Sequence, residues 1–298
     1  MKQFIIAHIS DIHLPLDNVP FSAFDLLNKR FLSYLSWKNR RLFHKKAILD
    51  LVIQDMIKSH PDLVAISGDL TNLALPGEFK HAAQWLNQLP FPNIRVIPGN
   101  HDALIKTKWH QNDALWTPWT KAYQADDYPI VHRIGPVALI ALNSGLPTPP
   151  FFARGHVNFL QLQRLKYALQ QTKVEKLCRI IMLHHPPVSG LVSERKALKD
   201  RDDLQKVILD EGAEMILYGH VHKTITKRFL HTSIPMLGIS SASSCSSRYD
   251  RQAAWRKIVV TPTSEGWNLQ TVARTINKDH QFTDMHAFSL DINRMANQ

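Results

Sequence analysis

Near its start the chain carries FIIAHISDIH, residues 4–13, in which a mostly apolar run, Phe4–Ile9, is followed after Ser10 by an Asp-x-His pair. A short, nearly continuous apolar run of this kind is typical of a strand that is buried on both faces. Five later runs have the same length and composition and predict further buried strands. These runs are Leu63–Ile66, Ile94–Ile97, Val137–Leu142, Ile180–Leu183 and Met215–Tyr218.

Segments with helical spacing of apolar residues separate these runs, at 48–57, 79–89, 159–169 and 204–208. Strands that alternate with helices predict an α/β fold, in which helices cover a sheet. After His222 the pattern changes to strand-like pieces at 224–230, 234–239, 255–260 and 267–272. We expect one domain over residues 1–284, a loosely held tail at 285–298, and a flexible connector in the serine-rich stretch Ser240–Ser247.

Composition limits the partners and the compartment. The 36 Lys and Arg residues outnumber the 25 Asp and Glu residues, and a net charge of +11 favours anionic partners. No apolar run approaches the 18 residues of a membrane span, and Ile5–Ile9 is too short for a signal peptide. Cys178 and Cys245 stand in no metal-binding spacing and predict no disulfide framework. We therefore expect a cytoplasmic protein.

Five of the six apolar runs end in a cluster of residues that commonly bind metal ions. Ligands of open α/β sheets lie beyond the carboxyl ends of the strands, so five segments that are distant in sequence are expected to meet there. The clusters are Asp11-Ile12-His13, Gly68-Asp69, Gly99-Asn100-His101-Asp102, His184-His185-Pro186-Pro187 and Gly219-His220-Val221-His222.

The spacing within these clusters suits metal binding. Alternate residues of an extended chain point the same way, so Asp11 with His13, and His220 with His222, could each grip one ion. A carboxylate has two oxygens and can bridge two cations, a role for which Asp69 is placed. Asn100 would add an amide oxygen without adding negative charge. A lone motif of this kind is weak, but five in order at strand ends indicate one metal centre.

In the order of these motifs, residues 3–225 resemble the calcineurin-like metallophosphoesterases. Gly68-Asp69-Leu70-Thr71 and the pair of histidines before Pro186 most resemble the bacterial phosphodiesterases acting on cyclic nucleotides or glycerophosphodiesters. The resemblance implies a four-layer αββα sandwich with two mixed β-sheets, in which the strands after His222 complete the second sheet. It also makes residues 1–284 a catalytic domain.

The resemblance implies two metal sites. One ion would be held by Asp11, His13, Asp69 and His222, and the other by Asp69, Asn100, His184 and His220. We choose His184 over His185 because the family ligand stands two residues before the proline matched by Pro186. The mixed ligands suit two divalent or mixed-valence ions of Mn, Fe, Zn, Co or Ni.

The expected chemistry is in-line attack on a phosphodiester by a hydroxide that bridges the two metals, with catalytic His101 stabilising or protonating the leaving alkoxide. Two ions and a hydroxide, with Asp11 and Asp69, would leave the site near +1, which suits a diester better than a monoester. Protein phosphatases of the family carry Asp-Arg where Asn72-Leu73 stand here. That difference argues against a protein phosphatase and leaves open what orients His101.

Residues 14–46 form a basic amphipathic insert that we expect near the site, because it directly follows the first ligand cluster. Apolar residues at 24, 27, 31 and 35 recur with helical spacing among seven Lys and Arg residues. Residues 24–46 could lie on an anionic membrane at its inner face, admit a lipid substrate, or pack on their own domain.

Three functions fit the sequence. The first is a phosphodiesterase for a small molecule, such as a cyclic nucleotide or a glycerophosphodiester. The alternative is a pyrophosphatase for a nucleotide-linked lipid of the UDP-diacylglucosamine type, and a third reading is a non-catalytic scaffold of the same fold. Scaffolds of that kind lose ligands, and none is missing here. No specific nucleic-acid module is recognised.

Overall fold

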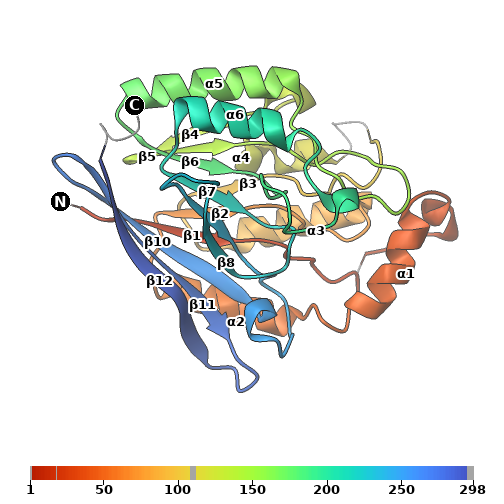
Figure 1. The fold of residues 1–298 in the computed structure, drawn as a ribbon. Helices are drawn as coiled ribbons and strands as arrows, with labels where there is room; N and C mark the ends of the chain where they lie inside the picture. The colour runs from red at the N-terminus through yellow and green to blue at the C-terminus, as the bar shows by residue number, and fades with distance from the viewer. Residues whose placement is uncertain (1, 18, 108–111, 294–298) are drawn as a thin grey trace.

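Two six-stranded sheets form the centre of the computed structural model, which describes residues 2–17, 19–107 and 112–293 (Figure 1). The first sheet has the order β12-β11-β10-β1-β2-β3; β1, β2 and β3 run parallel, and β10 to β12 run antiparallel to their neighbours. Its strands are β1 Phe4–Ile9, β2 Leu63–Ile66, β3 Ile94–Val96, β10 Ala254–Pro262, β11 Gly266–Ile276 and β12 Phe282–Asn293.

The second sheet has the order β4-β5-β6-β7-β9-β8 and is parallel from β5 through β9. Its strands are β4 Ile130–Ile134, β5 Val137–Ala141, β6 Cys178–Met182, β7 Met215–Tyr218, β8 Ile225–Arg228 and β9 Pro235–Gly238. One apolar cluster joins the sheets, with Ile6 and Leu63 from the first packed with Leu139 and Ile180 from the second.

Helices cover the outer face of each sheet. Helices α2 (Lys46–Ile57) and α3 (Pro76–Gln88) share an apolar cluster with the first sheet, and α5 (Phe159–Val174) and α6 (Arg201–Glu211) share another with the second (Figure 1). The predicted four-layer αββα architecture is therefore confirmed. Among the described residues, the other helices are α1 Arg30–Arg40, α4 Thr117–Thr120, and the 3-10 turns Ala23–Leu26, Asp113–Trp116, Ala125–Asp127, Glu194–Lys196 and Tyr249–Arg251.

The C-terminal third differs from the prediction. Only β8 and β9 complete the second sheet; β10, β11 and β12 extend the first, because the outer edge of β1 accepts β10 as an antiparallel partner. Residues 285–293, predicted as part of a tail, lie within β12 and pair with β11. The alternate side chains of Phe288, Leu290 and Ile292 are half-buried, a period of two that indicates a strand. Residues 294–298 lie outside the described part.

The segment 14–46 lies at one edge of the molecule, where α1 stands apart from the sheets (Figure 1). The apolar stripe from residue 24 is not one helix: a 3-10 turn precedes α1, which begins after Lys29. The inner side of α1 packs Tyr34 and Trp37 on a small cluster. The buried Arg30 donates hydrogen bonds to the carbonyl oxygens of Leu73 (2.9 Å) and Ala74 (2.6 Å).

Because β1, β2 and β3 are parallel in one sheet, and β5, β6 and β7 in the other, each set of carboxyl ends lies at one edge. The polar clusters at 11–13, 69, 100–102, 184 and 220–222 follow five of these six strands. Within the described residues, no helix is long and apolar enough to cross a membrane.

Candidate metal centre

The chain leaving β1 runs beside the chain leaving β2. The amide of Asp11 donates to the carbonyl of Gly68 (2.9 Å), and the amide of His13 donates to the carbonyl of Asp69 (3.0 Å). Asp11 and His13 are not extended, as the prediction assumed. Both have left-handed backbone conformations, with φ of 52° and 45°. They do converge, but through left-handed backbone at both residues rather than through strand alternation.

Asp69 lies at the middle of the site. Its Oδ2 is 3.4 Å from Nε2 of His184 and 4.0 Å from Nε2 of His13, and its Oδ1 accepts the amide of His101 (2.7 Å). Gly68 makes the turn before it, with φ of 100° and no room for a Cβ between Gly99 and His184. The carboxylate thus faces side chains of both predicted ligand sets.

The structure separates His184 from His185. His184 Nε2 is 3.2 Å from Oδ1 of Asn100, and its Nδ1 contacts the carbonyl of Ser67. His185 instead uses Nδ1 with Ser144 Oγ (2.8 Å) and Nε2 with the carbonyl of Ala153 (3.2 Å). Only His184 therefore presents a ring nitrogen to Asp69 and Asn100.

The turn after β7 brings the ring of His222 and the backbone amide of His220 to Asp11, while Nε2 of the His220 ring lies 2.9 Å from the carbonyl of Lys196. His222 Nε2 lies 3.1 Å from Asp11 Oδ1 and 3.4 Å from His13 Nε2, and the amide of His220 donates to Asp11 Oδ2 (3.0 Å). Both histidines have positive φ, 66° and 52°. Such backbone is rare for side chains with a Cβ and is kept only where the surroundings enforce it.

The donor set fits divalent ions. One atom each from Asp11, His13, Asp69 and His222 lies within 4.8 Å of the others, and the fully buried Asp11 carboxylate has an oxygen, Oδ1, that faces Nε2 of His222 at 3.1 Å. A buried carboxylate oxygen of that kind is costly unless a cation meets it.

Electrostatics favours cations at this point. Burial would raise the pKa values of Asp11 and Asp69, but neighbouring histidines hold both well below the usual range. Burial would likewise lower the pKa of His184, yet Asp69 and Asp11 raise it to about 9. Two buried carboxylates therefore remain ionised and attract positive charge.

His101 is held by main-chain atoms. Its Nδ1 lies 2.8 Å from the backbone carbonyl of Asn72, which can only accept, so Nδ1 carries the proton. The Asn72 side chain is used elsewhere and donates to the carbonyl of Leu14 (2.7 Å). His101 is thus oriented by a backbone carbonyl oxygen. Any residue type at position 72 supplies that oxygen, so the sequence could not predict the contact.

The model of the calcineurin-like phosphoesterase family matches residues 4–224. The chain belongs to this family. A Synechococcus protein named "probable cyclic nucleotide phosphodiesterase" is 28% identical over 74% of this chain and 79% of its own length. An Arcobacter nitrofigilis protein named "probable glycerophosphodiester phosphodiesterase" is 24% identical over 87% of this chain and 86% of its own length.

The fold of this calcineurin-like phosphoesterase also matches solved phosphatases. A purple acid phosphatase from yellow lupin seeds superposes with a TM-score of 0.66 at 12% identity. The match covers 99% of this chain, which spans only 55% of the lupin protein. At this identity the likeness concerns the fold alone.

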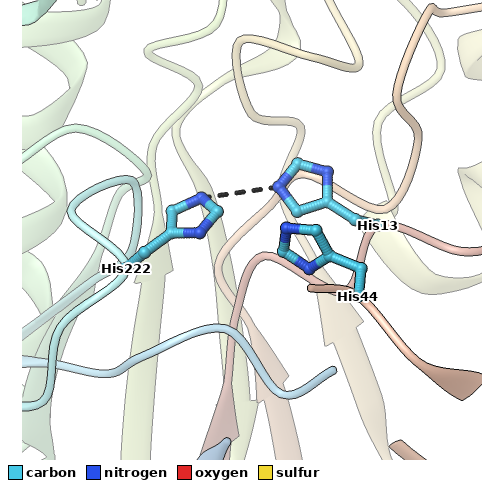
Figure 2. Close-up of side chains that lie close together, drawn as sticks. All are labelled: His13, His44 and His222. Atoms are coloured by element: carbon cyan, nitrogen blue, oxygen red, sulfur yellow. Dashed lines mark hydrogen bonds between the residues drawn. The ribbon is translucent and has the colours of Figure 1, made fainter. Parts of the chain in front are cut away.

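Sequence reasoning missed one histidine of the phosphoesterase site. His44, at the end of the segment 14–46, offers a ring nitrogen within 4.8 Å of those of His13 and His222 (Figure 2). The serine-rich stretch, predicted as a flexible connector, supports it: Ser240, Ser241 and Ser243 are buried, and Ser243 Oγ is 2.8 Å from His44 Nδ1. A histidine within a basic insert belongs to none of the predicted metal-binding clusters, so its place in the sequence does not indicate that it reaches the site.

Asp102 is a second residue to which sequence reasoning gave no role. Its carboxylate accepts the amides of Asp69 (2.8 Å), Gly99 (2.8 Å) and Thr71 (2.9 Å). It therefore ties the loop after β3 to the loop after β2, and fixes Asn100 and His101 relative to Asp69.

Two cavities open at the site. One, of about 530 Å³, is lined by Asp69, Asn100, His101, Ala153, Leu191, Val192, Ser193, Arg195, Lys196, His220, Val221, His222, Lys223 and Arg251. The other, of about 420 Å³, is lined by His13, Pro15, Asp17, Trp37, Arg41, Leu42, His44, Lys45, Lys46, Asn72 and His81. Basic side chains thus flank the histidines on both sides, which suits an anionic substrate.

Proposed function

We propose that this chain is a dinuclear metal phosphoesterase that hydrolyses a small-molecule phosphodiester. The observation that carries the proposal is the position of Asp69, whose carboxylate lies between two groups of side chains that can bind metals. One ion would be held by Asp11, His13, Asp69 and His222. The other would be held by Asp69, Asn100, His184 and His220.

Bound divalent ions would supply Lewis acidity toward the phosphate oxygens and lower the pKa of water at the site. Asp11 and Asp69 neutralise two of the four positive charges, so the site stays cationic and attracts a phosphate ester. Arg195 and Arg251, which line the larger cavity, add to this potential. The names of both relatives, which refer to cyclic nucleotides and glycerophosphodiesters, support a diester rather than a monoester.

His101 would act on the leaving group. Its Nδ1 proton is directed at the carbonyl of Asn72, so its Nε2 side lines the larger cavity beside Asp69 and Asn100. In the imidazolium form, Nε2 could deliver a proton to the departing alkoxide oxygen, a role that suits histidine near neutral pH.

The test is hydrolysis after loading the metal-free protein with Mn, Fe, Co, Ni or Zn. The panel contains bis-p-nitrophenyl phosphate, p-nitrophenyl phosphate, cyclic AMP and glycerophosphodiesters, and the Asp69→Asn variant is the matched control. We expect the diesters to turn over faster than the monoester, and the variant to be inactive. A preference for the monoester would overturn the diester assignment, and loaded protein without turnover would favour a non-catalytic scaffold.

A second candidate substrate is a nucleotide-linked lipid of the UDP-diacylglucosamine type, and the outer surface of the segment 14–46 favours it. Large apolar side chains are exposed there beside the exposed Lys38, Arg41 and Lys45. The same segment lines the smaller cavity next to His13. We name this surface the apolar–basic surface, and its apolar members are Phe24, Leu27, Phe31, Leu35, Leu42 and Phe43.

Such a surface fits an anionic bilayer, because the apolar side chains can enter the interface while the basic ones meet lipid head groups. Sedimentation with phosphatidylglycerol vesicles should therefore occur at low salt and weaken as salt rises. The double variant Lys38→Glu/Arg41→Glu should bind less. Absence of sedimentation at low salt, or dimer formation through this surface without lipid, would remove the bilayer as its partner. Selective cleavage of UDP-diacylglucosamine over the water-soluble diesters would establish the second candidate.

A further inference from the structure

His44 lies beside two of the proposed ligands although it comes from a different part of the chain. Figure 2 shows the rings of His13, His44 and His222 turned toward one another. The ring centroids are 4.6 Å apart for His13 and His44, and 5.7 Å apart for His44 and His222. One nitrogen of each ring lies within 4.8 Å of the other two. Nitrogens held about 2.1 Å from one tetrahedral ion are about 3.4 Å apart, so the three rings would have to move closer together to share an ion.

Hydrogen bonds link His44 through Ser243 and Ser241 to the backbone of Asp11, and each group donates to the next. The carbonyl oxygen of Asp11 can only accept, so Ser241 Oγ donates its proton to it (2.6 Å). With that proton used, Ser241 Oγ can only accept from its two other side-chain neighbours, Ser243 Oγ and Nδ1 of His44, each 3.2 Å away. With its own proton used, Ser243 Oγ accepts from Nδ1–H of His44 (2.8 Å).

This direction sets the tautomer of His44. A proton on Nδ1 leaves Nε2 of the neutral ring with a lone pair, the form in which imidazole binds metals. Metal-binding histidines commonly donate their second ring nitrogen to a supporting oxygen in this way. The relay ends on the backbone of Asp11, itself a proposed ligand, so His44 is positioned by the same loop that carries the site.

The main chain around His44 is also attached to the serine-rich stretch. The amide of Lys45 donates to the carbonyl of Ser243 (2.8 Å), and the amide of Cys245 donates to the carbonyl of Phe43 (2.8 Å). His44 and Ser244 form an antiparallel bridge. The position of His44 is therefore fixed by a short piece of sheet rather than by side-chain contacts alone.

We propose that His44 is a third imidazole ligand of the ion held by His13 and His222, and that it couples the segment 14–46 to the metal centre. This inference rests on the proposed metal centre. Its consequence is that the apolar–basic surface and the wall of the smaller cavity become most ordered when the metal is bound.

The experiment measures metal binding without hydrolysis. Protein stripped of metal is titrated with Co²⁺ and Zn²⁺ against a competing chelator, and the Co²⁺ absorption spectrum is recorded. Wild type is compared with His44→Ala, with Ser243→Ala, and with His81→Ala. His81 lines the same cavity but lies outside the histidine cluster.

We expect His44→Ala to lower the affinity for one of the two ions by about 100-fold, and to change the Co²⁺ absorption spectrum, because that ion loses a ligand. Ser243→Ala should lower the affinity for the same ion by about tenfold. This is the lower end of the loss that follows when a group that hydrogen-bonds a metal ligand is removed. His81→Ala should leave both affinities unchanged. Trypsin should cut at Lys38, Arg41 or Lys45 faster in metal-free wild type and in metal-loaded His44→Ala than in loaded wild type.

Unchanged affinities and an unchanged Co²⁺ spectrum in His44→Ala would overturn this inference and leave the proposed function intact. A raised KM with unchanged metal affinity would also overturn it and would assign His44 to the substrate. If wild type bound no ion, both the inference and the proposed function would fail. If His44→Ala did not fold, Ser243→Ala would decide, and full metal affinity in that variant would count against the inference.

Discussion

The loops that follow the parallel strands and the segment 14–46 meet at the same cavity but are held in opposite ways. In the loops, Asp11, Asp69 and His184 are buried, and backbone amides tie each loop to the next. In the segment, Phe24 and Leu27 are 82% and 77% exposed, and α1 contacts the domain through Arg30, Tyr34 and Trp37.

This difference in burial matches two roles: the loops place the metal ligands, and the segment presents a surface to a partner. Ligands must be placed before a metal or substrate arrives, so their backbone is enforced by neighbours even where φ is positive. A surface that meets a partner needs exposed side chains, and such parts of a protein have low local stability. We therefore expect substitutions in the loops to affect chemistry strongly, and substitutions on the exposed side of α1 and of the turn before it to affect local order and partner binding.

The largest effect is expected from Asp69→Asn. The change removes the only carboxylate shared by the two proposed ligand sets, so metal content and turnover should both fall. We expect the turnover of a diester to fall by more than about 10⁴-fold, the upper end of the cost of losing a general acid. Metal analysis and steady-state kinetics check this. Full metal content with full turnover would show that Asp69 does not bridge.

His101→Ala should have the next largest effect, and it should depend on the leaving group. We expect a fall of about 10²–10⁴-fold for an alkyl diester, the range for loss of a general acid. The fall should be much smaller for bis-p-nitrophenyl phosphate, whose leaving group needs no proton. Equal losses on both substrates, at unchanged metal content, would assign His101 a structural role instead.

Arg30→Ala tests how α1 is held. The change leaves the carbonyl oxygens of Leu73 and Ala74 without the guanidinium donor. A buried polar group that loses its hydrogen-bond partner costs about 1–3 kcal/mol. The free energy of local opening of α1 should fall by that amount. Native-state hydrogen exchange should show faster exchange in Arg30–Arg40 and no change in β1 and β2. Uniformly faster exchange would mean that α1 unfolds only with the whole domain.

The smallest effect on stability is expected from Phe24→Ser/Leu27→Ser. Both side chains are exposed, so the free energy of unfolding should change by only about 0.5 kcal/mol per site. Turnover of a water-soluble diester should be unchanged, whereas sedimentation with anionic vesicles should weaken. Chemical denaturation and the vesicle assay measure the two quantities. A large loss of stability would show that these residues belong to the core.

Apolar runs predicted the central strands closely. Strands β1, β2 and β7 have the predicted bounds, because a strand buried on both faces leaves an unbroken apolar record. Strand β12 was missed, since an edge strand shows only alternation, and the register shift opposite Thr271 and Ala273 of β11 interrupts that alternation between Met285 and Phe288. The short β4 was missed for a similar reason: only its central residue is buried.

Residue identity and order along the chain determined the family, the layered fold and the list of candidate ligands, because each ligand type follows a recognisable strand. Only the tertiary structure decided which sheet β10 joins, which peptide oxygen orients His101, and that His44 reaches His13 and His222. The physical reason is that these outcomes depend on backbone atoms and on contacts between distant segments. Side-chain patterns record burial and local geometry, but every residue except proline offers the same carbonyl and amide groups wherever the fold places them.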